Sequence, residues 1–253
     1  MSFALEVKTI SKSYGSYSIF QNISFQLSQG EVVGLLGLNG AGKSTLLKCL
    51  ATYIQYDGGS LVCSGYNAQK ASYQYKSLIG FQPESTNLHP HLTVEEQLTF
   101  FAKIRSISDY KYRVDELIEL LSLASIRYAP CSELSKGESQ RVNFCIATVH
   151  KPLVLLLDEP TNGLDPEQLA FFRAAIAYER TTRAVLLSTH HMHEAQSLTD
   201  RIVLLHNGSL KDVERGHEQS SLELEQLFLQ NLKTKAFDDK KVVSIKNAQV
   251  ING

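Results

Sequence analysis

Apolar and polar positions alternate along residues 5–8 and 23–27, with the two-residue period of half-buried β-strands. Gln29 and Gly30 follow and provide a turn. The next apolar stretch, residues 32–36, is continuous, as in a strand that is covered on both faces. We therefore predict an antiparallel β-unit at the start of the chain, followed by the first strand of a buried sheet.

Two later stretches, residues 153–157 and 184–187, are also continuously apolar, and segments of helical character separate them from residues 32–36. Buried strands separated by helices are typical of a parallel α/β sheet. Residues 201–205 and 209–213 flank a hairpin turn signal and predict an antiparallel pair.

The middle of the chain has the pattern of helices. Thr93 and Glu96 have the spacing of a capping box that opens an amphipathic helix through Ile104. Further on, apolar side chains recur at helical spacing, at Val114, Leu117, Ile118 and Leu121. We also predict a last helix over residues 221–232, followed by a weakly ordered polar tail.

Composition narrows the class of protein. The net charge is -1 and lysines and arginines are scattered, so we predict no nucleic-acid partner. No apolar run approaches the roughly 20 residues that cross a bilayer, and the first residues lack the pattern of a signal peptide. The four cysteines are far apart and have no metal-ligand spacing, which favours a reduced, cytosolic setting.

Residues 37–44 match the phosphate-loop pattern GxxxxGK[ST], between a predicted buried strand and a predicted helix. Glycines let the backbone wrap around phosphates, and the N-terminus of the following helix favours negative charge. Lys43 is expected to contact the β- and γ-phosphates, and Ser44 to ligate Mg²⁺. The predicted ATP-binding residues here are Gly37, Leu38, Asn39, Gly40, Ala41, Gly42, Lys43, Ser44 and Thr45.

Polar residues at the ends of other buried strands point to the same place, because ligands of open α/β sheets bind at the carboxyl ends of strands. Asp158 is the expected Mg²⁺ partner, and Glu159 the general base that polarises the attacking water. His190 is a candidate contact of the γ-phosphate. Gln82 is either a contact of Mg²⁺ or the attacking water, or an ordinary polar strand end. Tyr14 either stacks on a purine or is a turn residue.

These motifs, together with residues 134–141 (LSKGESQR), resemble an ATP-binding cassette (ABC) ATPase over nearly the whole stretch from about residue 3 to 215. The resemblance implies a P-loop NTPase core with a mostly parallel sheet. It also implies an ATPase domain of residues 1–215, which includes an N-terminal antiparallel β-subdomain and an α-helical subdomain inserted at 85–150. We expect residues 216–253 to form a C-terminal helix and tail.

The resemblance also assigns roles. It gives Tyr14 the adenine-stacking position. It makes Gln82, Lys43, Glu159 and His190 catalytic residues, and Gln82 also a contact of the metal ion. Two such chains pack head to tail, so that Ser135 and Gly137 of one chain contact the γ-phosphate that the other chain binds. Residues 162–165 are the D-loop of the family, and Asp165 in this loop also belongs to the ATP site. In a single chain we expect Ser135 to be exposed.

By the same resemblance, residues 134–140 are the signature motif of the family. This signature departs from its commonest form, because Lys136 and Glu138 stand where LSGGQ has Gly and Gln. A carboxylate aimed at the γ-phosphate would repel it. Ser135 and Glu138 also have capping-box spacing. We therefore hypothesise that the Glu138 side chain folds back onto the backbone N–H of Ser135.

The expected function is that of the ATP-hydrolysing subunit of an ABC transporter. It is expected to need ATP and Mg²⁺, to dimerise (a homodimer, since all motifs are present), and to drive separate transmembrane permease subunits from the cytoplasmic face of the cell membrane. Its segments look most like cassettes of type two exporters. The alternatives are an ABC ATPase that acts on DNA or ribosomes, and a nucleotide-binding regulator without turnover.

Overall fold

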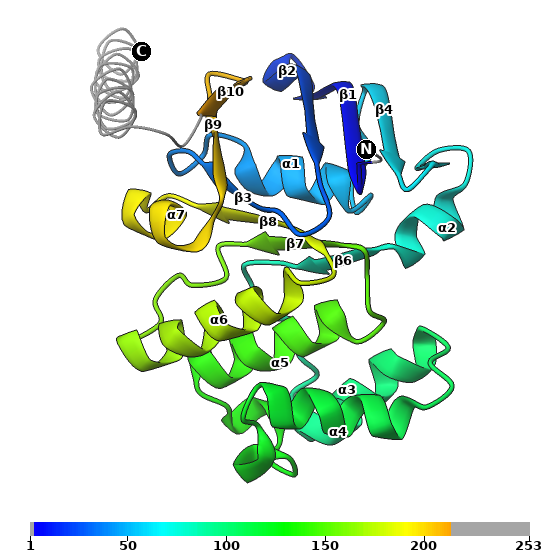
Figure 1. Ribbon diagram of the computed structural model, residues 1–253, viewed down its shortest axis with the longest axis vertical. Helices are drawn as coiled ribbons and strands as arrows, with labels where there is room; N and C mark the ends of the chain where they lie inside the picture. Colours follow the sequence, from blue (N-terminus) through cyan, green and yellow to red (C-terminus); the bar gives the residue numbers. More distant parts are fainter. Residues whose placement is uncertain (1–2, 214–253) are drawn as a thin grey trace, which may run out of the picture.

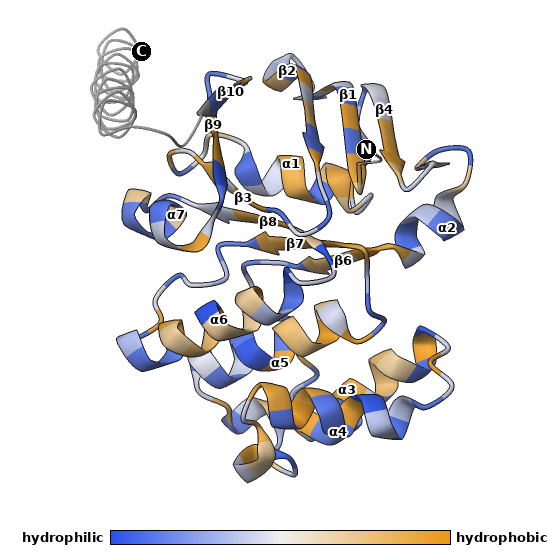
Figure 2. Ribbon diagram, viewed as in Figure 1, coloured by the Kyte–Doolittle hydropathy of each residue, from blue (hydrophilic) through white to orange (hydrophobic). Residues whose placement is uncertain are grey.

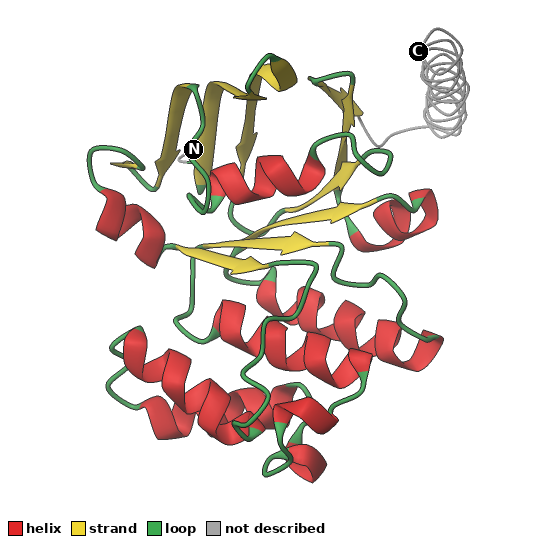
Figure 3. Ribbon diagram, turned by 180° about the vertical axis from the view of Figure 1, so that it is seen from behind, coloured by secondary structure: helices red, strands yellow, loops and turns green. Residues whose placement is uncertain are grey.

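A computed structural model describes residues 3–213 of the chain (Figure 1). The predicted last helix at 221–232 and the tail therefore lie outside the described residues. Within residues 3–213, two β-sheets and two layers of helices stack on one another, as Figure 3 shows from behind. Among these residues, no helix combines the length and the apolar character needed to cross a membrane.

The central sheet has the predicted mixed character. Its strand order is β10-β9-β3-β8-β7-β6, with all neighbours parallel except the hairpin β9–β10. The strands are β3 (Val32–Leu36), β6 (Ile79–Gln82), β7 (Val154–Asp158), β8 (Ala184–Thr189), β9 (Arg201–His206) and β10 (Ser209–Val213). The mostly parallel α/β class is confirmed. The carboxyl ends of β3, β6, β7 and β8 meet at one edge, where the motif residues follow.

The second sheet is antiparallel, in the order β2-β1-β4-β5. Its strands are β1 (Leu5–Tyr14), β2 (Tyr17–Leu27), β4 (Gly58–Cys63) and β5 (Tyr66–Asn67). The predicted strands at 5–8 and 23–27 are present but longer than the alternation indicated. Register shifts between Val7 and Ser13 interrupt the two-residue period, so pairing with neighbouring strands, rather than pattern, carries β1 on to Tyr14.

Seven α-helices lie within the described residues, and they cover both faces of the central sheet (Figure 1). Helix α1 lies between the two sheets, whereas α5 and α6 cover the opposite face of the central sheet, with α3 and α4 beyond α5. The helices are α1 (Lys43–Leu50), α2 (Ser72–Ser77), α3 (Val94–Ile104), α4 (Tyr110–Leu120), α5 (Lys136–Thr148), α6 (Pro166–Glu179) and α7 (Met192–Leu198).

The continuous apolar pattern of the central strands follows from this layering. In β7, Val154 and Leu156 pack into the core that α1 shares with the antiparallel sheet, whereas Leu155 and Leu157 pack into the core beneath α5 and α6. Each strand thus needs apolar side chains on both faces. Figure 2 shows this as apolar colour along the central strands.

A buried arginine joins helix α4 to helix α5. Arg113 of α4 is buried and donates hydrogen bonds to the carbonyl oxygens of Thr148 and Val149, at the end of α5 (2.7 and 3.1 Å). These carbonyls have no partner within the helix, so a cation there is favourable. Thr93 and Glu96 form the predicted capping box at the start of α3.

We predict that Gly80→Ala destabilises the fold by about 1–3 kcal/mol through overpacking. Gly80 lies in β6, where an added Cβ would collide with the carbonyl oxygen of Ala147 and approach the ring of Pro152. Gly58→Ala is the matched control, because a Cβ there meets nothing within 4 Å. Denaturant unfolding measures both. A Gly80→Ala loss no larger than that of Gly58→Ala would contradict the prediction.

Candidate functional site

The phosphate loop joins β3 to α1, and its backbone requires glycine. Gly40 and Gly42 have φ values of 80° and 102°, which side-chain-bearing residues rarely adopt. An added Cβ at Gly37 would lie 2.8 Å from the carbonyl oxygen of Leu205 in β9. The loop is therefore pressed against the sheet edge, and the backbone N–H groups at the start of α1 are available to an anion.

A cavity of about 360 Å³ opens beside this loop. It brings together residues from the loop, from the ends of β7 and β8, and from the segment after β6. Its lining residues are Ile19, Asn39, Gly40, Gly42, Lys43, Ser44, Thr45, Glu84, Glu159, Asn162 and His190. Of these, Ile19, Glu84 and Asn162 were not predicted to belong to the site; an added Cβ at Gly42 would lie 2.7 Å from the Ile19 side chain.

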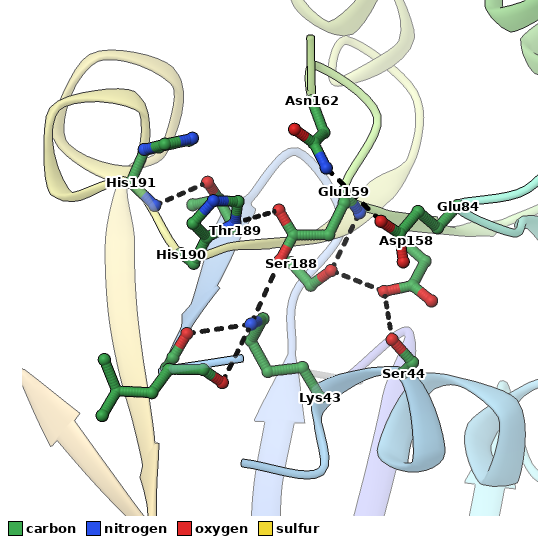
Figure 4. A network of polar contacts seen from close by, with 12 residues as sticks. Lys43, Ser44, Glu84, Asp158, Glu159, Asn162, Ser188, Thr189, His190 and His191 are labelled. Atoms are coloured by element: carbon green, nitrogen blue, oxygen red, sulfur yellow. Dashed lines mark hydrogen bonds and ion pairs between the residues drawn. The ribbon is translucent and has the colours of Figure 1, made fainter. Parts of the chain in front are cut away.

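Lys43, Glu159 and His190 form one chain of polar contacts in the cavity (Figure 4). The ammonium of Lys43 lies 3.1 Å from Oε1 of Glu159 and donates to the carbonyl oxygen of Gly37 at 2.8 Å and of Leu38 at 3.3 Å. Oε2 of Glu159 is 2.9 Å from Nδ1 of His190. Both carboxylate oxygens of Glu159 are thus held, which compensates a charge that is almost fully buried.

Asp158 occupies a neighbouring polar network. Its Oδ1 accepts hydrogen bonds from the hydroxyls of Ser44 (3.0 Å) and Ser188 (2.8 Å). Burial raises the pKa of Asp158, and the carboxylates of Glu84 and Glu159 raise it further, while the two hydroxyl bonds act in the opposite direction. A cation at this position would favour the ionised carboxylate.

Glu159 has a left-handed backbone conformation, with φ of 47°. Such a conformation costs about 1–3 kcal/mol for a residue other than glycine and persists only where surrounding contacts hold it. Two backbone contacts do so here. The N–H of Glu159 donates to the Ser188 hydroxyl at 2.9 Å, and its carbonyl accepts from the N–H of Asn162 at 3.2 Å.

Gln82 ends β6 as predicted, but its amide turns toward α5. Its Nε2 donates to Oε1 of Gln140 at 2.6 Å, and Gln82 is fully buried and does not line the cavity. Its Oε1 is buried without a hydrogen-bond partner. The Gln140 amide also donates to the carbonyl of Glu84 at 3.1 Å, so this contact joins the helical layer to the segment after β6.

The donor set fits a magnesium ion. Mg²⁺ prefers oxygen ligands, and the Ser44 hydroxyl and the Asp158 carboxylate lie 3.0 Å apart at the loop. The Oε1 of Gln82 is buried without a hydrogen-bond partner, but Gln82 does not line the cavity that Ser44 lines, so its contact with Mg²⁺ stays a prediction. Ser44, Asp158 and Gln82 are the three residues expected from the sequence.

Tyr14 lies at the end of β1 and is 53% exposed, but it is not among the residues that line the cavity. The ammonium of Lys12 lies 5.0 Å from the centre of its ring, and the same ammonium pairs with Asp57 at 3.1 Å. The expected stacking of Tyr14 on the adenine therefore stays a prediction.

The signature forms the N-terminus of α5. Ser135 is exposed, and its hydroxyl accepts the N–H of Glu138 at 3.3 Å. Oε2 of Glu138 accepts the N–H of Ser135 at 2.8 Å, so the hypothesis that Glu138 folds back is confirmed. Hydrogen bonding of the Glu138 carboxylate to the Ser135 side chain and to the Ser135 backbone N–H lowers the pKa of Glu138.

The other signature and D-loop residues pack against each other. Gly137 lies beneath the amide of Gln168, and Asp165 caps α6 by accepting the N–H of Gln168 at 2.8 Å. Ser135, Gly137 and Asp165 line neither the cavity beside Lys43 nor a second cavity of about 460 Å³ that Lys136 shares with Ser44 and Asp158.

Similarity to known proteins identifies the family. The chain matches the family described as ABC transporter over residues 20–162. The linearmycin resistance ATP-binding protein LnrL of Bacillus subtilis (strain 168) is 34% identical over 209 residues, 81% of this chain and 67% of LnrL. The Nod factor export ATP-binding protein I of Paraburkholderia xenovorans (strain LB400) is 36% identical over 211 residues, 81% of this chain and 68% of that protein.

A relative whose name states import rather than export has a similar sequence identity to this chain. The probable sulfate/thiosulfate import ATP-binding protein CysA of Chlorella vulgaris is 36% identical over 219 residues, 85% of this chain and 92% of that protein. Among solved structures, an ATP-binding subunit of an ABC transporter superposes with a TM-score of 0.79 at 29% identity, over 88% of this chain and 99% of that chain. The chain therefore belongs to the ABC transporter family, as an ATP-binding subunit with ATPase activity.

Proposed function

We propose that two copies of this chain pack head to tail around two ATP molecules and drive separate transmembrane subunits. The observation that carries the proposal is the position of the signature. Ser135 is exposed at the capped start of a helix and lines neither cavity beside its own phosphate loop. A helix N-terminus is an anion site, and the phosphate that it meets in this arrangement belongs to the partner chain.

In the proposed reaction, Glu159 accepts a proton from water as the water oxygen attacks the γ-phosphorus, and the bond to the leaving oxygen of ADP breaks. Lys43 holds the phosphates. Because its ammonium also pairs with Glu159 at 3.1 Å, bound phosphate competes for this cation and frees one oxygen of Glu159. His190 keeps hold of the other oxygen at 2.9 Å and orients the carboxylate. This assignment relies on the buried, fully partnered state of Glu159.

Ser44, Asp158 and Gln82 would hold Mg²⁺, which when bound neutralises phosphate charge. Tyr14 would stack on the adenine, and Asp165 and Gly137 would join the composite site from the partner chain. A homodimer suffices, because one chain carries each of these residues.

We propose export as the direction of transport, with the chain at the inner face of the cell membrane through its transmembrane partners. The names of the Nod factor export protein and of the linearmycin resistance protein support this, whereas the name of the Chlorella relative states import. Purification of the tagged full chain from detergent-solubilised membranes tests the partnership. A co-purifying permease supports it, and co-purifying DNA or ribosomes instead would overturn it.

We predict that Glu159→Gln lowers the turnover number for ATP by about 10²–10⁴-fold, because a neutral amide does not accept the proton from water. ATP still binds and dimerises the chain. Phosphate release measures turnover, and Glu167→Gln, an exposed position in α6, is the control. Unchanged hydrolysis would remove the assigned role of Glu159.

Lys43→Ala is expected to weaken ATP binding by about 1.5–3 kcal/mol, because a charge-assisted contact to the phosphates is lost. Titration with a fluorescent ATP analogue measures the affinity. Lys48→Ala is the matched control, since Lys48 lies on the same helix and is exposed. If both variants bind equally well, Lys43 does not contact the nucleotide.

Glu138→Gln is expected to strengthen ATP-dependent dimerisation roughly two- to fivefold, since it removes a negative charge beside the incoming phosphate and keeps the capping box. Sedimentation of the Glu159→Gln protein at graded ATP concentrations measures this, and the gain should shrink as salt rises. Glu96→Gln, in the same kind of capping box on α3, is the control. Identical dimerisation of the two variants would refute the prediction.

A further inference from the structure

Glu194 of α7 connects the two loops that carry Glu159 and His190. Its Oε2 accepts hydrogen bonds from the hydroxyls of both Thr161 (2.8 Å) and Thr189 (2.9 Å). Thr161 follows Glu159 by two residues, and Thr189 directly precedes His190. Both threonines are buried, at 4% and 0% exposure, so these bonds are shielded from competing water.

The direction of each bond is fixed by chemistry. The Thr189 hydroxyl also accepts the N–H of His191 at 3.0 Å, as Figure 4 shows, so its single proton is free to go to Glu194. A carboxylate only accepts, so Thr161 must donate as well. One oxygen therefore receives both hydroxyl protons and sets the spacing between the two loops.

This spacing decides the geometry of the proposed general base. Nearer the sheet, the Ser188 hydroxyl accepts the N–H of Glu159 at 2.9 Å, but the loops then continue beyond β7 and β8. Glu159 has a strained φ of 47° and needs its flanking backbone held. Its 2.9 Å contact with His190 requires that both loops stay in place.

We propose that Glu194 is a positioning residue for ATP hydrolysis, which holds the loops of Glu159 and His190 in register without lining the ATP cavity. The inference rests on the proposed role of Glu159 as general base. A small displacement of a reacting group lowers the rate strongly, so a shift of Glu159 should lower turnover. The phosphate loop joins β3 to α1 and is not held by Glu194, so nucleotide binding should not change. Loss of Glu194 should therefore act on turnover and spare nucleotide binding.

In the full-length protein, Glu194→Ala is expected to lower kcat on the order of tenfold, with a change in KM for ATP below about threefold. Glu194→Gln should restore most of the rate, because an amide oxygen also accepts two hydrogen bonds. His193→Ala is the matched control, since His193 is an exposed neighbour on the same helix. A kcat of Glu194→Ala within twofold of His193→Ala, or no recovery in Glu194→Gln, would overturn the proposal.

A second comparison separates positioning from general damage. If Glu194 acts through Glu159, Glu194→Ala should add little to the loss already present in Glu159→Gln, whereas independent effects would multiply. Thr161→Val combined with Thr189→Val should reproduce the loss, and it serves as the test if Glu194→Ala does not fold. The inference would be refuted if the losses of activity from Glu194→Ala and Glu159→Gln multiply in the double variant. It would also be refuted if the variant with both Thr161→Val and Thr189→Val keeps its activity. Unchanged hydrolysis in Glu159→Gln itself would instead contradict the proposed base.

Discussion

Two adjacent carboxylates, Asp158 and Glu159, are buried at the carboxyl end of β7, and the rest of the site is arranged to compensate them. Asp158 is met by hydroxyls from α1 and β8, and Glu159 by the Lys43 ammonium and the His190 imidazole. Unpaired buried charges are costly, so these contacts hold strand ends and phosphate loop together. In the proposed reaction, the same groups bind ATP and cleave its terminal phosphoanhydride bond. Stability and activity therefore draw on the same few contacts.

The double-sided core makes this arrangement rigid. Strands such as β7 pack one face against α1 and the antiparallel sheet and the other face against α5 and α6. Strand ends that are packed on both sides move little, which lets Asp158 and His190 face the phosphate loop at a defined distance. Polar contacts, among them that of Gln82 with Gln140, add to the apolar packing of α5 against this sheet.

Capping boxes begin the two helices that carry the signature and follow the D-loop, α5 and α6. Ser135 with Glu138, and Asp165 with Gln168, each satisfy free backbone N–H groups at the start of a helix. At α5 this places a carboxylate where the family's commonest signature has an amide. In the proposed dimer, the phosphate held by the partner chain would meet both a helix N-terminus, which attracts it, and this negative charge, which repels it.

The sequence by itself determined the fold class and the residues whose roles depend on local pattern. The phosphate loop, the acidic pair Asp158–Glu159 and the capping boxes are each contained within a few residues, so spacing alone reveals them. Only tertiary structure decided which distant groups meet. The contact of Gln82 with Gln140 joins residues 58 positions apart, and that of Thr161 with Glu194 joins residues 33 positions apart. Such contacts depend on how strands and helices pack, and packing leaves no periodic signal in the chain.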